Sequence, residues 1–349
     1  MNLFQRYLAE EFAEDYQEGR ISRRKALRMI ASVTGSLVLA NSILAACAPV
    51  GNETPAATGG VIPTTGGPAA GDSTATVAPT QPDVTEAATA TEPVTEAAPT
   101  AAATEGSGAP QAAGTVAPDD PAVDAREVSF AGEDGQAVMA YLTTPSGDTE
   151  RPVVLVCHEN RGLTVHIQDV TRRLAKAGYV ALAVDLLSRS GGTAGLSSDE
   201  IPGVLGNTNP DQFVADFRAG WNYLQAEGIG VTDRVGMVGF CFGGGVTWRM
   251  ATRMPELKAA VPFYGPPPPV EDVPDIQAAV LAIYGGLDQR INQTIPAIEE
   301  AMNANDKIYE KVIYEGADHA FHNDTSTRYH AESAIDAWAR TLAWFEQYL

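Results

Sequence analysis

The stretch "RVGMVGFCFGGGV", Arg234 to Val246, decides how the rest of the sequence is interpreted. An apolar run leads directly into glycines, with Cys241 at the turn and a glycine two positions away on either side. This pattern predicts a strand, a tight turn and a helix, because side chains at the glycine positions would clash. The first N–H groups of the helix would favour a thiolate, and that of Phe242 would stabilise an oxyanion. Two interpretations stay open on this stretch alone: a nucleophilic cysteine, or a buried thiol in a Gly-rich turn.

Strand-like and helix-like segments alternate around this stretch. Apolar runs predict strands at 152–160, 180–188, 234–240, 257–265, 278–288 and 309–321, after a hairpin at 126–147. Amphipathic patterns predict helices at 166–179, 211–227, 243–254, 295–305 and 330–349. The alternation predicts one α/β domain over residues 125–349, with a mostly parallel sheet covered by helices on both faces. Ligands of such folds bind at the carboxyl ends of the strands.

Two further residues with catalytic chemistry follow predicted strands. Asp288 lies in "IYGGLDQRI", and His319 lies in "YEGADHAFHN". The chain order Cys241, Asp288, His319 is that of the nucleophile, acid and histidine in α/β-hydrolase triads. His319 would take the proton from sulfur, and Asp288 would hold the imidazole in the right tautomer. Each residue is ordinary in isolation, but the ordered set predicts a catalytic triad.

The domain resembles the dienelactone hydrolase family, carboxymethylenebutenolidase-like α/β-hydrolases with a Cys-Asp-His triad. The resemblance rests on "GFCFGG", "GGLD", "HAFHN" and on Glu159 in "VCHENRG", and it spans essentially all of residues 125–349. It implies hydrolysis of an ester, lactone or thioester through a thioester acyl-enzyme, with no cofactor. It also implies that Glu159 contacts the resting thiol and that the N–H groups of Phe242 and Asn160 form the oxyanion hole.

The resemblance is incomplete where the substrate binds. Family members hold the substrate's carboxylate with two arginines, and Arg189 in "DLLSRSGG" matches one of them. The other position is Asn323, and whether the nearby Arg328 substitutes stays open. Arg189 could equally be a solvated surface charge, and Glu159 could form an ion pair with Arg161 or Arg189. The predicted substrate is therefore a small ester or lactone of open identity.

Other functions remain as alternatives. A non-catalytic binding module, or a carboxylesterase or peptidase, could use the same fold. The formal net charge of −21 argues against nucleic-acid binding. The five histidines form no metal motif, and His322 and His330 match no zinc spacing with His319, so we expect no metal site. We expect the catalytic domain to be monomeric.

Cys157 bears on the state of the nucleophile. It precedes Glu159 by two residues, so both would lie on the same face of a strand. A disulfide between Cys157 and Cys241 would silence the enzyme, and our hypothesis is that Cys241 stays reduced.

The N-terminal third has a different composition. The "SRRKALRM" stretch, Ser22 to Met29, resembles a twin-arginine export signal, and Leu44 to Cys47 resembles a bacterial lipobox. The resemblance implies that residues 1–47 are an export signal, with cleavage before Cys47 and lipid attachment to its sulfur; an uncleaved signal anchor is the alternative. Residues 48–124, rich in Ala, Thr, Pro and acidic residues, predict a disordered linker. We therefore expect a domain tethered outside the cytoplasmic membrane of a bacterium.

Overall fold

The computed structural model describes residues 1–46, 114–147 and 149–349. Cys47 and most of the predicted linker lie outside these residues. The predictions of lipid attachment and of linker disorder therefore stay predictions.

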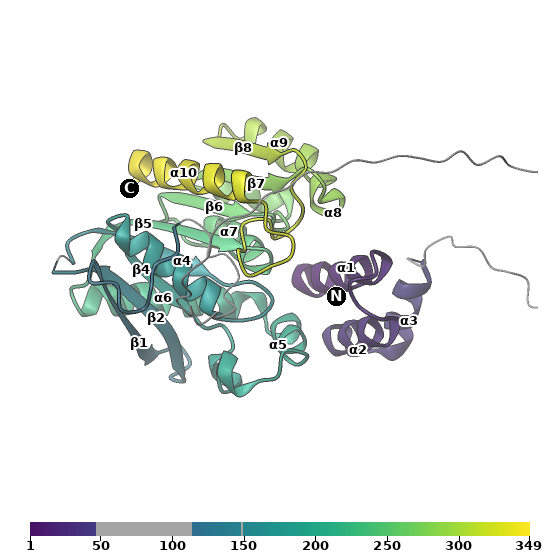
Figure 1. Ribbon diagram of the computed structural model, residues 1–349. Coiled ribbons are helices and arrows are strands. Elements are labelled where there is room, and N and C mark those ends of the chain that lie inside the picture. The colour runs from purple at the N-terminus through teal and green to yellow at the C-terminus, as the bar shows by residue number, and fades with distance from the viewer. Residues whose placement is uncertain (47–113, 148) are drawn as a thin grey trace, which may run out of the picture. The chain divides into compact units, whose positions relative to one another are not determined.

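One eight-stranded sheet forms the centre of the catalytic domain, in the order β1-β2-β4-β3-β5-β6-β7-β8 (Figure 1). The strands are β1 (Val123–Ala131), β2 (Ala137–Pro145), β3 (Pro152–Cys157), β4 (Val180–Val184), β5 (Val231–Phe240), β6 (Ala259–Phe263), β7 (Ala279–Gly285) and β8 (Tyr309–Tyr314). β1, β2 and β4 pair antiparallel, and every other neighbouring pair is parallel. The prediction of a mostly parallel α/β sheet is confirmed.

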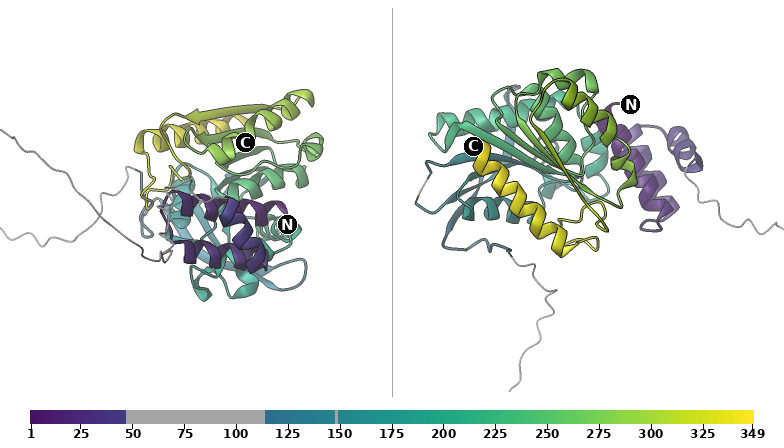
Figure 2. Two further views of the ribbon diagram at one scale, coloured as in Figure 1. Left: turned by 90° about the vertical axis from the view of Figure 1, so that its right-hand side faces the viewer. Right: turned by 90° about the horizontal axis from the view of Figure 1, so that it is seen from above.

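Helices cover both faces of this sheet. α4 (Val165–Lys176) and α10 (Ala331–Tyr348) lie on one side, and α6 (Pro210–Ala226), α7 (Phe242–Arg253) and α9 (Ile295–Ala304) lie on the other (Figure 2). In α4 the fully buried side chains Ile167, Val170 and Leu174 recur at helical spacing, so one stripe of the helix faces the sheet. The inner strands are apolar throughout because both of their faces are covered.

The ordered domain begins before residue 125, where we placed its boundary. Val123 opens β1, and Val116 is buried. The N–H of Val116 donates to Asp169 at 2.7 Å, and its carbonyl accepts from Arg172 at 2.7 Å. These contacts come from α4, about fifty residues away along the chain, so the composition of 114–124 gave no sign of them. The sequence also did not predict two short helices, α5 (Ile201–Asn207) and α8 (Gln289–Asn292), because neither shows a periodic pattern of apolar residues.

The N-terminal segment is helical. It forms α1 (Leu3–Gln17), α2 (Arg23–Thr34) and α3 (Leu37–Ala46). A capping box between Asn2 and Gln5 begins α1. We expected this segment to stand apart from the fold, but Phe4 and Ile30 are fully buried and belong to the main hydrophobic core. No helix in the described part of the chain is long and apolar enough to cross a membrane.

Candidate active site

Cys241 lies at the turn between β5 and α7, as the sequence predicted. Its backbone has φ 59° and ψ −120°, a conformation that residues with a side chain rarely adopt. The N–H of Cys241 donates to Phe263 at 3.1 Å, and its carbonyl accepts from Gly244 at 2.9 Å. The surrounding backbone thus holds the strained residue in place at the carboxyl end of a central strand.

Glycines on either side permit this turn. A Cβ atom on Gly239 would lie 2.2 Å from the carbonyl oxygen of Gly243. A Cβ atom on Gly243 would lie 2.5 Å from the carbonyl oxygens of both Cys157 and His158. Because these neighbours are backbone atoms, they cannot turn aside as a flexible side chain would. The glycine pattern therefore has the steric cause that the sequence suggested.

His319 and Asp288 form the second part of the site. Nδ1 of His319 lies 2.6 Å from Oδ2 of Asp288, and both side chains are almost completely buried. Burial alone would lower the pKa of His319, but the charges of Asp288 and Cys241 raise it to about 10. Burial would likewise raise the pKa of Asp288, and the charge on His319 lowers it. This carboxylate–imidazole pair orients the ring, so that Nδ1 faces Asp288 and Nε2 faces the Tyr7 hydroxyl.

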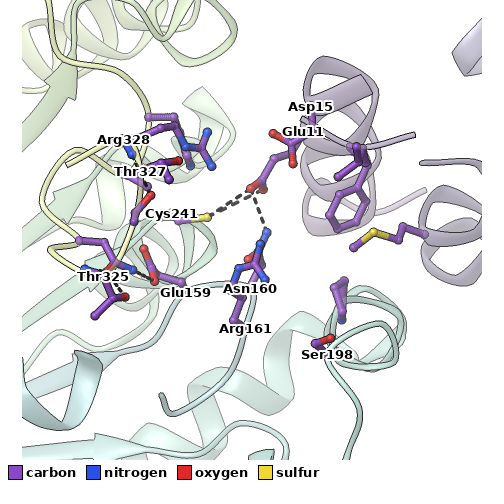
Figure 3. A pocket seen from close by; sticks show the side chains of 18 of the residues that line it. Glu11, Asp15, Glu159, Asn160, Arg161, Ser198, Cys241, Thr325, Thr327 and Arg328 are labelled. Atoms are coloured by element: carbon purple, nitrogen blue, oxygen red, sulfur yellow. Dashed lines mark hydrogen bonds between the residues drawn. The ribbon is translucent and has the colours of Figure 1, made fainter. Parts of the chain in front are cut away.

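Two residues of α1 contact Cys241. The hydroxyl of Tyr7 lies 3.1 Å from Sγ of Cys241 and 3.2 Å from Nε2 of His319. Both carboxylate oxygens of Glu11 lie 3.8 Å from the same sulfur (Figure 3). Burial, followed by the charges of Cys241 and Glu11, raises the pKa of Tyr7 well above its ordinary value, so the phenol stays neutral. The thiol therefore has a hydroxyl and a carboxylate as neighbours.

Glu159 has a different contact from the one we expected. It is buried in the same site, but its Oε2 accepts a hydrogen bond from the side-chain amide of Asn323 at 2.7 Å. Among the described residues, no hydrogen bond joins Glu159 to Cys241; the carboxylate that contacts the thiol is Glu11. The expectation of a resting Glu159–thiol contact is therefore wrong for this structure. Asn323, which stands where the family has its second arginine, binds Glu159 instead.

The two residues proposed as oxyanion donors follow neighbouring strands, Phe242 after β5 and Asn160 after β3. Phe242 is the first residue of α7, where N–H groups have no partner inside the helix. Asn160 is buried near the end of β3, and its side-chain amide donates to Glu11 at 2.9 Å (Figure 3). Their placement at two neighbouring strand ends is compatible with the predicted role.

A cavity of about 390 Å³ opens at Cys241. Arg328, Arg161 and Lys25 bring positive charge to its lining. Burial would lower the pKa of Arg328, but the charges of Glu11 and Asp15 raise it. Four carboxylates, those of Glu11, Asp15, Glu159 and Asp199, line the same cavity, so charges of both signs surround Cys241.

Arg189, expected to bind substrate, does not line this cavity. It forms ion pairs with Asp134 at 2.8 Å and with the buried Asp216 at 2.6 Å. The hydrogen bond from Arg189 lowers the pKa of Asp134 to about 2. Because its donors are engaged by these two carboxylates, Arg189 stabilises the fold, and the substrate-binding prediction is wrong here.

Both cysteines of the catalytic domain are free thiols in this structure. Burial raises the pKa of Cys157 well above its ordinary value, so this thiol is protonated and inert. His322 is likewise buried, and it stacks on Phe240 at 5.1 Å between ring centroids. Burial lowers its pKa well below the ordinary value, which is typical of a neutral core histidine.

Among the residues that the structure describes, one group of side chains could hold a metal ion. Glu11, Cys241 and His319 each offer one ligand atom, and these atoms lie within 4.8 Å of one another. Oxygen, sulfur and nitrogen donors suit zinc, and Asp288 would orient the imidazole. The sequence gave no such site because Glu11 is 230 positions from Cys241.

Sequence reasoning missed Tyr7 and Glu11. Their helix carried a signal that could have been found: apolar residues recur at Phe4, Tyr7, Leu8 and Phe12, which is the spacing of one helix face. That pattern indicates a helix that packs on something, although it does not identify the partner.

Comparisons with known proteins agree with this geometry. Residues 138–349 match the model of the Dienelactone hydrolase family. A relative from Methylorubrum extorquens, provisionally named a carboxymethylenebutenolidase, is 39% identical over 246 residues, or 67% of this chain and 84% of the relative. A relative from Escherichia coli K12 with the same provisional name is 36% identical over 247 residues, or 66% of this chain and 89% of the relative.

Two solved structures share the fold. A protein from Klebsiella pneumoniae, provisionally described as a dienelactone hydrolase, is 36% identical with a TM-score of 0.61, covering 65% of this chain and 100% of its own. A dienelactone hydrolase-like promiscuous phosphotriesterase from metagenomic libraries is 25% identical with a TM-score of 0.57, covering 65% of this chain and 99% of its own.

Proposed function

The chain belongs to the dienelactone hydrolase family, and from this premise we propose that it hydrolyses a small ester, lactone or thioester with Cys241 as the nucleophile. One observation carries the proposal. The strained Cys241 lies beside His319, whose other ring nitrogen is held by Asp288 at 2.6 Å. A buried thiol in an ordinary turn would need neither the strain nor the oriented imidazole.

In the first half of the reaction, His319 already holds the thiol proton, as its raised pKa favours, and the sulfur of Cys241 attacks the carbonyl carbon as a thiolate. The N–H groups of Phe242 and Asn160 donate to the oxyanion that forms. The tetrahedral intermediate then collapses. The bond to the leaving oxygen breaks, His319 returns the proton to that oxygen, and a thioester remains on Cys241.

In the second half, water replaces the leaving group. His319 takes a proton from the water as it attacks the thioester carbon, and the same N–H groups stabilise the second oxyanion. Collapse releases the carboxylic acid and regenerates the Cys241 thiolate, which the imidazolium protonates. Asp288 stabilises the charged imidazole in both halves.

One cationic side chain of the cavity could bind an anionic group of the substrate. Arg328 lines it, whereas Arg189 is engaged with two carboxylates elsewhere. Asn323 stands where the family's second arginine would bind the substrate's carboxylate, but it is uncharged and binds Glu159. Arg328 is then the cationic residue for this role. We infer that Arg328 holds the substrate's carboxylate while the ester carbon meets Cys241.

We also propose that the protein is exported and held at the outer face of a bacterial membrane through lipid on Cys47. Support comes from the resemblances at Ser22 to Met29 and at Leu44 to Cys47 and from the exposure of Arg23 and Arg24 at the start of α2. Mass spectrometry of the chain from membranes tests this. A diacylated N-terminal Cys47 is expected, and an unmodified N-terminus at Met1 would contradict it.

Cys241→Ala tests the hydrolase. It should lower turnover of p-nitrophenyl esters and lactones about 10³-fold or more while the fold stays intact. Cys157→Ala is the matched control, since it also removes one buried thiol but should keep most of the turnover. Equal activity of Cys241→Ala and wild type would refute the nucleophile. A wild type with no turnover and no acyl-enzyme would favour a non-catalytic binding module.

A further inference from the structure

Helix α1 places a side chain where the reaction would take place. The hydroxyl of Tyr7 lies 3.1 Å from the sulfur of Cys241 and 3.2 Å from Nε2 of His319, so it lies between nucleophile and base. From this juxtaposition we propose that the chain's own N-terminal helices, residues 3–46, cover Cys241 and His319 and act as an intramolecular inhibitor. The inference rests on the proposed hydrolase function.

A substrate cannot react while the Tyr7 hydroxyl lies between Cys241 and His319. The substrate carbonyl must come within about 3–3.5 Å of the sulfur, with its leaving oxygen in reach of the imidazole. The Tyr7 hydroxyl holds that space, and Cys241 is only 3% exposed. Substrate therefore reaches the sulfur only in molecules whose α1 has left the cavity, and this fraction sets the basal turnover.

Glu11 occupies the part of the cavity that suits an anion. Its carboxylate accepts from the side chain of Asn160 at 2.9 Å, and it contributes to the raised pKa of Arg328. A substrate carboxylate would compete with Glu11 for Asn160 and Arg328. The helix thus places the Tyr7 hydroxyl between Cys241 and His319, and the Glu11 carboxylate beside the sulfur and Asn160.

Apolar packing fixes α1 in this position. The ring of Phe4 lies 5.6 Å from that of Phe213 and 4.9 Å from that of Phe242, measured between centroids. All three side chains are fully buried, and Phe242 directly follows the nucleophile. Docking of the helix is therefore coupled to the same structural unit that holds Cys241.

Ion pairs join the helix to the loops that carry the acid and the histidine. Glu14 pairs with Arg290 at 3.0 Å, two residues beyond Asp288. Arg20, just after the helix, pairs with Asp318 at 2.8 Å. All these contacts are non-covalent, so the helix can dissociate without any bond being broken. Cleavage before Cys47, if export proceeds as proposed, would separate the inhibitor from the enzyme and activate it.

Alkylation of Cys241 measures how well the helix covers it. Full-length protein is treated with iodoacetamide, and peptide mass spectrometry separates Cys241 from Cys47 and Cys157. In the Phe4→Ala variant, iodoacetamide should label Cys241 at least about tenfold faster than in wild type. The variant loses a buried aromatic contact that holds α1 over Cys241. Arg6→Ala, an exposed change on the same helix, is the control and should label at the wild-type rate.

A second variant tests the same inference if the Phe4→Ala protein does not fold. The double change Glu14→Ala with Arg20→Ala removes only partly exposed ion pairs and should label several-fold faster than wild type. Thermal unfolding shows which variants remain folded. The folded variants should also gain turnover by the same factor as labelling.

The outcomes separate this inference from the proposed function. Faster labelling without turnover in any variant would support the inhibitory helix and refute the hydrolase. Wild type that labels as fast as the folded variants would overturn the inhibitory helix, whether or not it turns over esters. A uniform increase that includes Arg6→Ala would also overturn it, since the effect would then be one of general stability.

Discussion

The hydroxyl of Tyr7 lies 3.1 Å from the sulfur of Cys241, although 234 positions separate the two residues in the chain. Because the same hydroxyl lies 3.2 Å from Nε2 of His319, the N-terminal helix reaches both reacting groups. The face of the α/β domain that carries Cys241 and His319 is therefore covered by a segment that composition alone would assign to export.

Asp288→Asn should lower kcat about 10³–10⁴-fold, because the amide cannot hold the imidazole in its catalytic tautomer or stabilise its charge. Asp336→Asn is the matched control, as Asp336 pairs with Arg340 on α10 and should not affect turnover. Steady-state kinetics on one activated ester measures both. Equal kcat values for the two variants would remove Asp288 from the mechanism.

His319 should make stability fall as pH rises. Its pKa is raised from about 6.5 in the unfolded chain to about 10 in the fold. The stabilising contribution is complete below about pH 6.5, where both states are protonated, and is lost as pH rises toward 10. Urea unfolding of wild type and His319→Gln at several pH values isolates this contribution. The difference in free energy of unfolding should shrink by a few kcal/mol at most, and a pH-independent difference would contradict it.

Gly243→Ala should destabilise the protein by about 1–3 kcal/mol and lower turnover, because the new Cβ would lie 2.5 Å from two backbone oxygens. Gly195→Ala is the control, since its nearest neighbour would be a carbonyl oxygen at 3.9 Å. Chemical denaturation and kinetics check both effects. A stable and fully active Gly243→Ala would show that the turn is less constrained than its geometry indicates.

Arg328→Ala should raise KM for esters that carry a carboxylate about tenfold, with little effect on neutral esters of the same size. Arg189→Ala should leave this preference unchanged. It should instead cost about 1–3 kcal/mol of stability, because Asp216 is left buried without its partner. Kinetics on paired anionic and neutral esters, with thermal unfolding, distinguish the two arginines. Loss of the anionic preference only in Arg189→Ala would reverse these assignments.

Local patterns were enough to predict most of the sheet and the positions of Cys241, Asp288 and His319 at the ends of strands. The buried runs before Asp288 and His319 predicted strands, and β7 and β8 end just before these residues. The turn at Cys241 followed from steric limits that act within a few residues. Such features depend on near neighbours in sequence, which is why a single chain reveals them.

These short-range patterns could not predict contacts between segments that are far apart in the sequence. Glu159 was expected at the thiol, but Asn323 binds it, and the carboxylate beside Cys241 is Glu11. Arg189 was expected at the substrate, but Asp134 and Asp216 bind it. A charged side chain reaches several partners of similar chemistry, and packing selects among them.

The sequence by itself determined the α/β class, the placement of Cys241, Asp288 and His319 after strands, and the glycines that shape the turn at Cys241. Periodicity and short-range sterics encode these features directly. Only the tertiary structure decided which side chains surround the sulfur and that α1 covers it. Those contacts join residues more than 200 positions apart, where the free energy of burial and charge pairing acts through the whole fold.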